Sequence, residues 1–224
     1  MFRAIPPAAR GHPSFPLPVT VPQADIPAFI PLSLLEAIRN LDTPLEDGLE
    51  ELSPEIVSKR LGLSPTVAAQ IERYRAETER SASVDEAEAV SVFRLVGRRP
   101  DAALVFADAG RRAARYAARS APALLRVAPG GMGRKIAGRA ARRATRDAFL
   151  AEMKSAEGTP EVRMAAPLSV AAWPGGEACG FYAAAFAELL RTLTGFEGTM
   201  RHESCRGRGD AACVWRAAQA ESYE

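Results

Sequence analysis

Residues 176–215 read GEACGFYAAAFAELLRTLTGFEGTMRHESCRGRGDAACVW, and they hold all three cysteines and one of the two histidines of the 224-residue chain. The four residues are Cys179, His202, Cys205 and Cys213, in the pattern C-x22-H-x2-C-x7-C. Thiolates and a neutral imidazole are the ligand set that tetrahedral zinc prefers. We therefore predict that these four side chains bind a structural zinc ion.

The surrounding sequence predicts a helix followed by a β-hairpin. Apolar residues recur at helical spacing after a Gly-Gly pair, so Cys179 is expected in the first turn of a helix, where the helix dipole favours a thiolate. Residues 198–205 and 212–216 have the pattern of two strands joined by a glycine-rich turn. The hairpin is expected to bring Cys213 opposite Cys205, against the helix end that carries Cys179.

Two other interpretations of the cysteines stay open. Free cysteines often serve as small buried apolar residues, and three in a chain of this length is ordinary. Cys205 and Cys213 also have the spacing of a hairpin disulfide, although one cysteine would then be left over. We find no secretory signal in the sequence, so we expect a cytoplasmic protein, in a reducing compartment where thiolates bind metal.

The same stretch resembles the 4-vinyl reductase domain family. The C-terminal half of that family has a cysteine before a helix, then an acidic residue and a cysteine, a G-x-G turn and a last cysteine. The residues of this chain at those positions are Cys179, Cys205, Gly207, Gly209 and Cys213. Phenol-responsive transcription activators carry a similar sensor domain, in which such positions bind zinc beside an aromatic ligand pocket. The family often has glutamate where this chain has His202, so the adjacent Glu203 is an alternative oxygen ligand.

The resemblance implies an α+β domain over residues 89–218, with helices packed on a twisted antiparallel sheet. Subunits of the vesicle-tethering TRAPP complex share this architecture, which is often dimeric, so a homodimer is expected. A small apolar or aromatic ligand is also implied. Trp173, Phe181 and Trp215 are the candidates for lining its pocket, although packing is the commoner role of such side chains. The family name adds an accessory role in tetrapyrrole (bacteriochlorophyll) metabolism as an alternative.

The N-terminal third separates into two segments. Residues 1–30 are rich in proline, which fixes φ and removes a backbone donor, so an extended arm is expected there. Residues 31–80 carry helix signals, and the sequence SPEIVSKRLGLSPTVAAQIERYR at residues 53–75 predicts two short helices around a tight turn. This is the pattern of a helix-turn-helix, which we interpret as a helical appendage.

Thr66, Gln70 and Arg73 are the candidate DNA contacts of that helix pair, because a recognition helix presents such side chains near its N-terminal half. Acidic residues dominate the surrounding sequence, however, and attraction to phosphate dominates the affinity for nucleic acid. We therefore favour a packing or dimerisation role over DNA binding.

Residues 98–146 contain twelve arginines and one lysine against two aspartates, so the net charge of +2 conceals a basic middle. Two alanine-rich helices are expected there, at residues 102–121 and 134–153, separated by a loop at residues 129–133. The residues of the first helix expected to point inward are Leu104, Phe106, Ala109, Ala113 and Ala117. We interpret the arginines as solvated faces that pair with acidic residues of the same or a second subunit. An anionic membrane surface, nucleic acid or an anionic ligand are the alternatives.

Residues 161–173 predict one or two strands that lead to the cysteine-rich stretch. The chain has neither a G-x-S-x-G motif nor a nicotinamide or flavin fingerprint. No apolar run reaches about 18 residues, so no membrane span is expected. The predicted function is therefore a small-molecule-binding or sensor module rather than an enzyme, with a DNA-binding regulator as the alternative.

Overall fold

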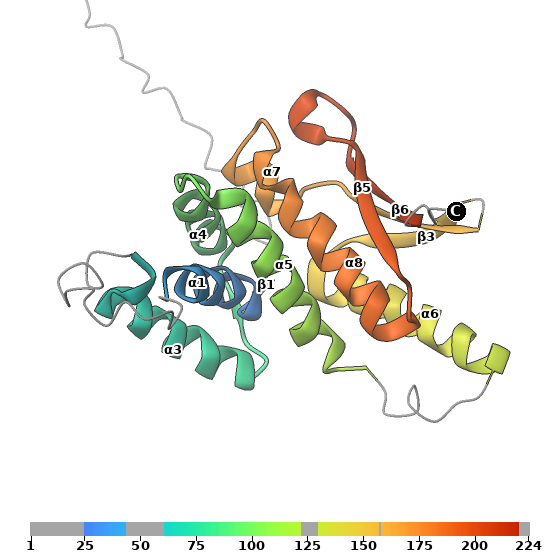
Figure 1. The fold of residues 1–224 in the computed structure, drawn as a ribbon, viewed down its shortest axis with the longest axis horizontal. Helices are drawn as coiled ribbons and strands as arrows, with labels where there is room; N and C mark the ends of the chain where they lie inside the picture. Colours follow the sequence, from blue (N-terminus) through green and yellow to red (C-terminus); the bar gives the residue numbers. More distant parts are fainter. Residues whose placement is uncertain (1–24, 44–60, 122–129, 157, 220–224) are drawn as a thin grey trace, which may run out of the picture.

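The structure, a computed structural model, describes residues 25–43, 61–121, 130–156 and 158–219. Within these residues the fold is α+β, as predicted: helices pack on an antiparallel sheet (Figure 1). None of the helices in these ranges is long and apolar enough to cross a membrane. Residues 1–24 and 53–60, on which the predicted arm and the first helix of the predicted pair depend, lie outside the described residues.

Four strands form the main sheet in the order β3-β4-β6-β5, and all neighbouring strands are antiparallel. The strands are β3 (Glu152–Ala156), β4 (Thr159–Met164), β5 (Gly198–Ser204) and β6 (Cys213–Gln219). Side chains alternate across a sheet, and the buried ones of neighbouring strands, such as Met153, Val162 and Trp215, share one face. The predicted hairpin is confirmed, and its second strand lies between β4 and β5.

Two long helices contact this sheet. α8 (Gly180–Thr194) packs against β5, α6 (Gly130–Phe149) packs against β3, and the two helices contact each other. The predicted loop at residues 129–133 is wrong from its second residue onward, because α6 already begins at Gly130. The predicted helix end at residue 153 is also wrong. Leu150 has a positive φ of 53°, which ends the helix and turns the chain into β3.

α5 (Ala102–Ala118) packs along α8. Its predicted inward residues are confirmed with one exception: Phe106, Ala109, Ala113 and Ala117 are buried, but Leu104 is 64% exposed. Each helical residue turns the side chain by about 100°, so Leu104 lies roughly opposite Phe106. The expectation that every apolar residue of this helix points inward is therefore wrong at Leu104.

The N-terminal helices belong to the same hydrophobic core as the sheet. They are α1 (Phe29–Asp42), the 3-10 turn η1 (Leu61–Leu63), α3 (Pro65–Glu79) and α4 (Glu86–Gly97). Ser64 caps α3 as predicted, because its hydroxyl accepts a hydrogen bond from the backbone N–H of Val67. Asp85 caps α4 in the same way through Ala87.

The sequence did not predict a short second sheet beside these helices. β1 (Ile26–Pro27) lies in the proposed arm and pairs with β2 (Ser83–Val84), which lies between α3 and α4. Helix α1 also starts two residues before the predicted position at residue 31. Proline is tolerated in β1 because this strand pairs on one side only, so its missing N–H breaks no ladder.

The prediction of a second strand within residues 161–173 is wrong. Leu168–Ala172 forms the short helix α7, preceded by Pro167. Leu168, Ser169 and Ala172 are buried, at the i, i+1 and i+4 spacing of a helix face, and α7 packs on α4. A five-residue apolar alternation fits a strand as well as a helix, and tertiary packing selects the helix here.

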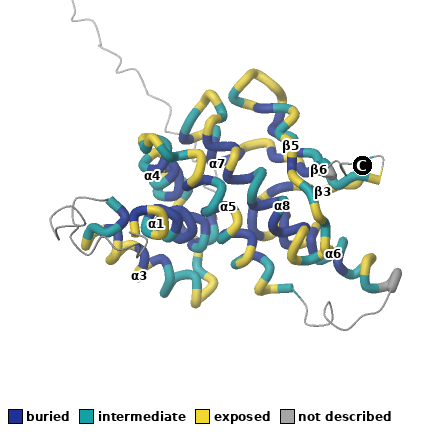
Figure 2. The backbone as a smooth tube through the Cα atoms, in the orientation of Figure 1, coloured by how far each residue is buried: buried dark blue, intermediate teal, exposed yellow. Residues whose placement is uncertain are grey.

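Buried aromatic side chains of α4, α5 and α8 pack together and reach Trp215 of the sheet, and each of these helices has dark, buried stretches in Figure 2. Phe93, Phe181 and Tyr182 form stacked and edge-to-face pairs, and Tyr182 and Phe186 continue them to Trp215. The β5–β6 hairpin packs on this aromatic cluster through Trp215.

A buried ion pair joins the N-terminal helices to α5. Asp42, at the end of α1, accepts hydrogen bonds from the backbone N–H of Gly62 at 2.8 Å and from both terminal nitrogens of Arg99 at 2.8 and 3.0 Å. Burial alone would raise the pKa of Asp42, but the hydrogen bonds from Arg99 and Gly62 lower it. The pair therefore fixes α1, η1 and the α4–α5 junction against one another.

Just after α3, Ser81 adopts the left-handed backbone conformation that glycine prefers. A substitution at this residue therefore tests how α3 ends. Ser81 has a φ of 55°, and Ala82 N–H bonds back to the carbonyl of Glu77. We expect Ser81→Gly to raise the free energy of unfolding by about 1 kcal/mol, because the left-handed region costs a non-glycine residue about 1–2 kcal/mol. Urea denaturation measures the change.

The matched variant is Gly195→Ala at the end of α8, where φ is 71° and an added Cβ would meet no other atom within 4 Å. It should lower the free energy of unfolding by about 1 kcal/mol. If both variants shift stability in the same direction, the described helix ends are wrong.

Candidate metal centre

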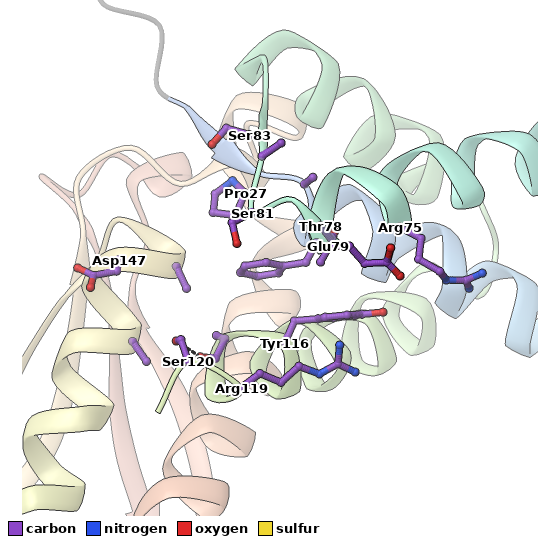
Figure 3. A pocket seen from close by; sticks show the side chains of 16 residues that line it. Pro27, Arg75, Thr78, Glu79, Ser81, Ser83, Tyr116, Arg119, Ser120 and Asp147 are labelled. Atoms are coloured by element: carbon purple, nitrogen blue, oxygen red, sulfur yellow. Dashed lines mark hydrogen bonds between the residues drawn. The ribbon is translucent and has the colours of Figure 1, made fainter. Parts of the chain in front are cut away.

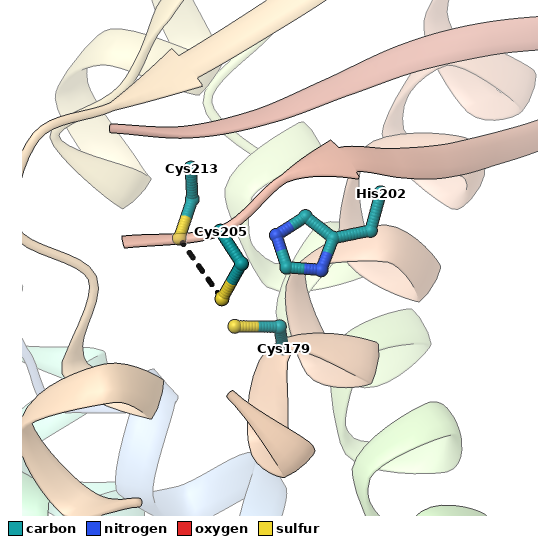
Figure 4. A group of neighbouring side chains, drawn as sticks. All are labelled: Cys179, His202, Cys205 and Cys213. Carbon is teal, nitrogen blue, oxygen red and sulfur yellow. Dashed lines mark hydrogen bonds between the residues drawn. The ribbon is translucent and has the colours of Figure 1, made fainter. Parts of the chain in front are cut away.

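The four predicted ligands come together although they lie on three different elements. Cys179 ends the 3-10 turn η3 (Glu177–Cys179) and caps α8, His202 lies on β5, Cys205 follows β5, and Cys213 begins β6. One ligand atom from each of them lies within 4.8 Å of all the others (Figure 4). The three cysteines are buried and free. The sequence prediction that these residues cluster is confirmed.

The spacing of the sulfur atoms distinguishes a metal site from a disulfide. Sγ of Cys205 and Sγ of Cys213 are 3.9 Å apart, far beyond the 2.03–2.05 Å of a disulfide bond. Two thiolates on a tetrahedral zinc, each about 2.3 Å from the ion, are about 3.8 Å apart. The distance therefore matches two sulfur ligands of one ion.

His202 presents its free nitrogen to the sulfurs. Nε2 of this residue is buried and has no hydrogen-bond partner among the described residues, and its ring points toward the cysteines (Figure 4). The ring stacks on the indole of Trp215, its partner across β5 and β6, with centroids 4.8 Å apart and planes at 12°. A buried nitrogen without a partner is costly, and a metal ion would satisfy it.

The protonation state of His202 suits a metal ligand. Burial lowers the pKa of its imidazole, and the nearby positive charge of Arg208 lowers it further. The ring is therefore neutral at pH 7, which is the form that binds metal.

Glu203, the alternative oxygen ligand, lies outside this cluster. Its side chain is 42% exposed, and its carboxylate is 3.5 Å from Nε of Arg216. His202, and not Glu203, belongs to the group whose ligand atoms lie within 4.8 Å of one another. The imidazole is therefore the side chain that lies with the three sulfurs.

Hydrogen-bond donors approach two of the sulfurs. The Ser169 hydroxyl is 3.2 Å from Sγ of Cys179, and the backbone N–H of Arg206 donates to Sγ of Cys213 at 3.3 Å. Three thiolates on a divalent ion leave one net negative charge, and such donors stabilise it.

A short turn holds Cys205 in place. The carboxylate of Asp210 accepts a hydrogen bond from the Cys205 backbone N–H at 2.7 Å, and the Cys205 carbonyl accepts from Arg208 and Asp210. The turn includes the 3-10 segment η4 (Arg206–Arg208) and Gly209, whose φ is 96°. The glycine-rich turn predicted here is confirmed, and Asp210 is a supporting residue that the sequence did not single out.

Burial opposes the thiolate state that was expected from the helix dipole. It raises the pKa of the Cys179 thiol to about 12, although the Ser169 hydroxyl acts in the opposite direction. Burial also raises the pKa of the Cys213 thiol. Without a metal, these thiols are protonated at neutral pH, so metal binding has to release their protons.

Two glycines allow the chain to approach the sulfurs, and sequence reasoning treated them only as turn residues. Gly176 has a φ of 85°, and a Cβ at this position would lie 2.5 Å from Sγ of Cys205. A Cβ at Gly207 would collide with the carbonyl of Pro174. The loop before η3 and the turn after β5 therefore pack backbone to backbone around the cluster.

The three predicted pocket residues lie in different surroundings. Phe181 and Trp215 are fully buried in the aromatic core. Trp173 is half-buried, its indole N–H donates to the carbonyl of Phe93 at 3.3 Å, and its ring lies against Gly97. All three act in packing, the commoner role already noted for such side chains.

The candidate DNA contacts lie beside α4. Thr66 and Gln70 line an open groove between α3 and α4. The guanidinium of Arg73 hydrogen-bonds to the carboxylate of Glu88 and lies 4.0 Å from that of Glu77. Arg73 is therefore neutralised by carboxylates of the same chain.

Comparison of the chain with protein-family models, with curated proteins and with solved structures gives no match. The resemblance to the 4-vinyl reductase family therefore remains a prediction. The metal centre rests on its own geometry.

A substitution at Gly176 tests whether this residue packs against the sulfur of Cys205 as described. We expect Gly176→Ala to lower the free energy of unfolding by more than about 2 kcal/mol, because the methyl group meets Sγ of Cys205 and the backbone has a positive φ. Urea denaturation and bound metal per chain are the measurements.

Gly180→Ala is the control, since it lies next to Cys179 and an added Cβ there meets nothing within 4 Å. It should leave metal content unchanged and stabilise the start of α8 slightly. Equal effects of the two substitutions would contradict the described contact.

Proposed function

We propose that Cys179, His202, Cys205 and Cys213 bind one zinc ion that has a structural role. The observation that carries this proposal is the buried Nε2 of His202, which has no partner in the described part of the chain and lies within 4.8 Å of three buried sulfurs. Four protein ligands complete the coordination of zinc and leave no position for a substrate. The ion is thus a cross-link rather than a catalyst.

The cross-link would join parts of the chain that already meet through packing and through a hydrogen bond from Arg206 to the carbonyl of Ala165. Cys179 connects it to η3 and α8, Ser169 connects it to α7 through the sulfur of Cys179, and the other ligands belong to the β5–β6 hairpin. Zinc would therefore fix the hairpin over the start of α8.

We propose further that the protein binds a small apolar or aromatic molecule in a cavity beside this cross-link. The cavity has a volume of about 210 Å³. Apolar side chains form most of its wall, from Ile26, Ile30, Phe149, Met164, Leu168 and Tyr182. An apolar cavity of about 150 Å³ is enough for benzene, so this one fits a single substituted ring.

The cavity and the metal centre share supporting residues. Met164 pairs with Cys213 across β4 and β6, Leu168 precedes the Ser169 that contacts Cys179, and Tyr182 lies one turn after Cys179 on α8. Loss of the ion should therefore loosen one wall of the cavity. This coupling supports a binding or sensor module of the kind that the 4-vinyl reductase resemblance implies.

One polar group gives the cavity a chemical preference. Glu86, at the start of α4, is the only acidic residue among those that line it. Its carboxylate accepts hydrogen bonds, so a ring with a hydroxyl or amino group is favoured over a carboxylated one.

A larger cavity of about 740 Å³ supports the alternative, a role in tetrapyrrole metabolism (Figure 3). Its wall includes Phe29 and Tyr116, whose rings stack with centroids 6.0 Å apart, and Arg119 lies over the Tyr116 ring at 4.4 Å. A planar, carboxylated ligand suits an aromatic wall with a neighbouring guanidinium. A saturable shift of a porphyrin's visible absorption bands on titration with the protein tests this alternative, and an unchanged spectrum would count against it.

The zinc proposal predicts about one equivalent of zinc per chain in protein purified without a metal-affinity tag. Cys205→Ser should lose the ion and lower the free energy of unfolding by several kcal/mol, because structural zinc contributes directly to folding. Elemental analysis and denaturation measure both effects.

Glu203→Gln is the matched control, since it changes an exposed residue next to His202. It should keep the zinc, whereas His202→Ala should lose most of it. Loss of metal in the glutamine variant would show that the carboxylate is a ligand and would contradict the proposed set.

The cavity proposal predicts that phenol and toluene raise the melting temperature in a saturable way, with phenol the stronger of the two. Ala166 is exposed at the cavity, and Ala166→Phe should abolish the shift by filling its mouth. Ala171→Phe is the control on the exposed side of α7. If neither compound shifts the wild-type protein, the cavity is not a ligand site.

A further inference from the structure

Helix α6 carries the most uneven charge distribution of the described helices. Its sequence, GGMGRKIAGRAARRATRDAF, has five arginines and one lysine against one aspartate. Ala137, Ala141, Ala144 and Ala148 are buried, at the spacing of a single helix face. Most of its basic residues therefore lie on the opposite face.

The basic residues form a line along the exposed face. Lys135, Arg139, Arg142 and Arg146 follow one another at i, i+4, i+7 and i+11, and all four are exposed. We call this set the basic stripe. Over eleven residues of helix it extends about 16 Å, at 1.5 Å per residue.

The proposed pairing of these arginines with acidic residues of the same chain holds for only part of α6. Asp147 is the one carboxylate of the helix, and it pairs with Arg143 and Arg146, whose side chains are 80% and 71% exposed. Within the described residues, Lys135, Arg139 and Arg142 have no carboxylate within 4.0 Å. Most of the stripe therefore faces solvent without a counter-charge.

An exposed leucine continues the stripe. Leu150, four residues after Arg146, is 55% exposed and has the positive φ of 53° that ends the helix. It lines a shallow groove of about 600 Å³ together with Arg142 and Arg146. Leu150 also lines the cavity of about 210 Å³, yet more than half of this large apolar side chain stays exposed beside arginines, in a costly backbone conformation.

From this juxtaposition we propose that the basic stripe and Leu150 dock on an anionic phospholipid surface. Clusters of four or more basic residues on an amphipathic helix attract anionic headgroups, and the leucine would enter the boundary between headgroups and acyl chains. A nucleic acid would use the arginines but would give the leucine no apolar environment. The membrane is therefore the partner that uses both features.

The test is sedimentation of the full chain with vesicles of phosphatidylcholine alone and of phosphatidylcholine mixed with phosphatidylserine. Binding is expected only to the mixed vesicles, and it should weaken as salt is added. Arg139→Gln with Arg142→Gln should lower the affinity roughly 30-fold, because each basic residue near an anionic surface contributes about 1 kcal/mol.

A second pair of substitutions controls for the loss of two positive charges. Arg163 and Arg201 are exposed on β4 and β5, and their buried strand neighbours place them on the sheet face away from α6. Arg163→Gln with Arg201→Gln should leave vesicle binding within about twofold of wild type. Equal losses in the two double variants would overturn the assignment to the stripe.

Leu150→Ser separates a membrane from a nucleic acid. It should reduce vesicle binding, most clearly at the higher salt concentrations, and leave any binding to duplex DNA unchanged. No sedimentation with mixed vesicles at low salt would overturn the proposal, as would displacement from vesicles by duplex DNA at equal phosphate concentration. Sedimentation needs neither zinc nor a cavity ligand, and Arg139 and Arg142 do not line the cavity, so failure of their test and failure of the proposed function are distinguishable.

Discussion

The close contact between α5 and α8 is the constraint on which the other parts of the fold depend. An added Cβ at Gly110 would collide with the backbone carbonyl of Phe181, so the two helices approach to a distance that only glycine permits. Buried alanines continue this contact along α5. The approach places Phe181 and Tyr182 in the aromatic core and Cys179, just before them, at the edge of the sheet. Both the metal centre and the apolar cavity are therefore positioned by one helix pair.

The sequence predicted the clustering of four side chains well and the fold around them less completely. The chemistry shared by three cysteines and a histidine was enough to bring together side chains from three elements. Local patterns also located the strands β5 and β6 and the cap of α3, since turn and cap residues act through neighbouring backbone groups. Features that depend on distant contacts were missed. They include the helix α7, the β1–β2 pairing, the outward Leu104, and the role of Gly176 beside Cys205.

In the proposed function, the metal centre stabilises the fold and a separate cavity binds the ligand. The four ligands of the centre would leave no open coordination position, and the cavity lined by Met164, Leu168 and Tyr182 is mostly apolar, with Glu86 as its acidic residue. The two are connected only through shared supports on β4, α7 and α8. Such an arrangement lets the ligand pocket change by substitution while the metal keeps the surrounding backbone in place. Phe181, Trp173 and Trp215 belong to this supporting layer, whereas Tyr182 also lines the cavity.

Strand β5 forms one edge of the main sheet, and its pairing with β6 is irregular. Its register with β6 shifts between His202 and Ser204, where the chain turns toward the cysteines. Regular edge strands are templates for pairing with other chains, and bulges and charged residues such as Arg201 and Glu203 make poor templates. A centre that holds this bulge in shape therefore also protects the molecule from edge-to-edge self-association. Metal loss would expose the protein to aggregation through β5 before its helices unfold.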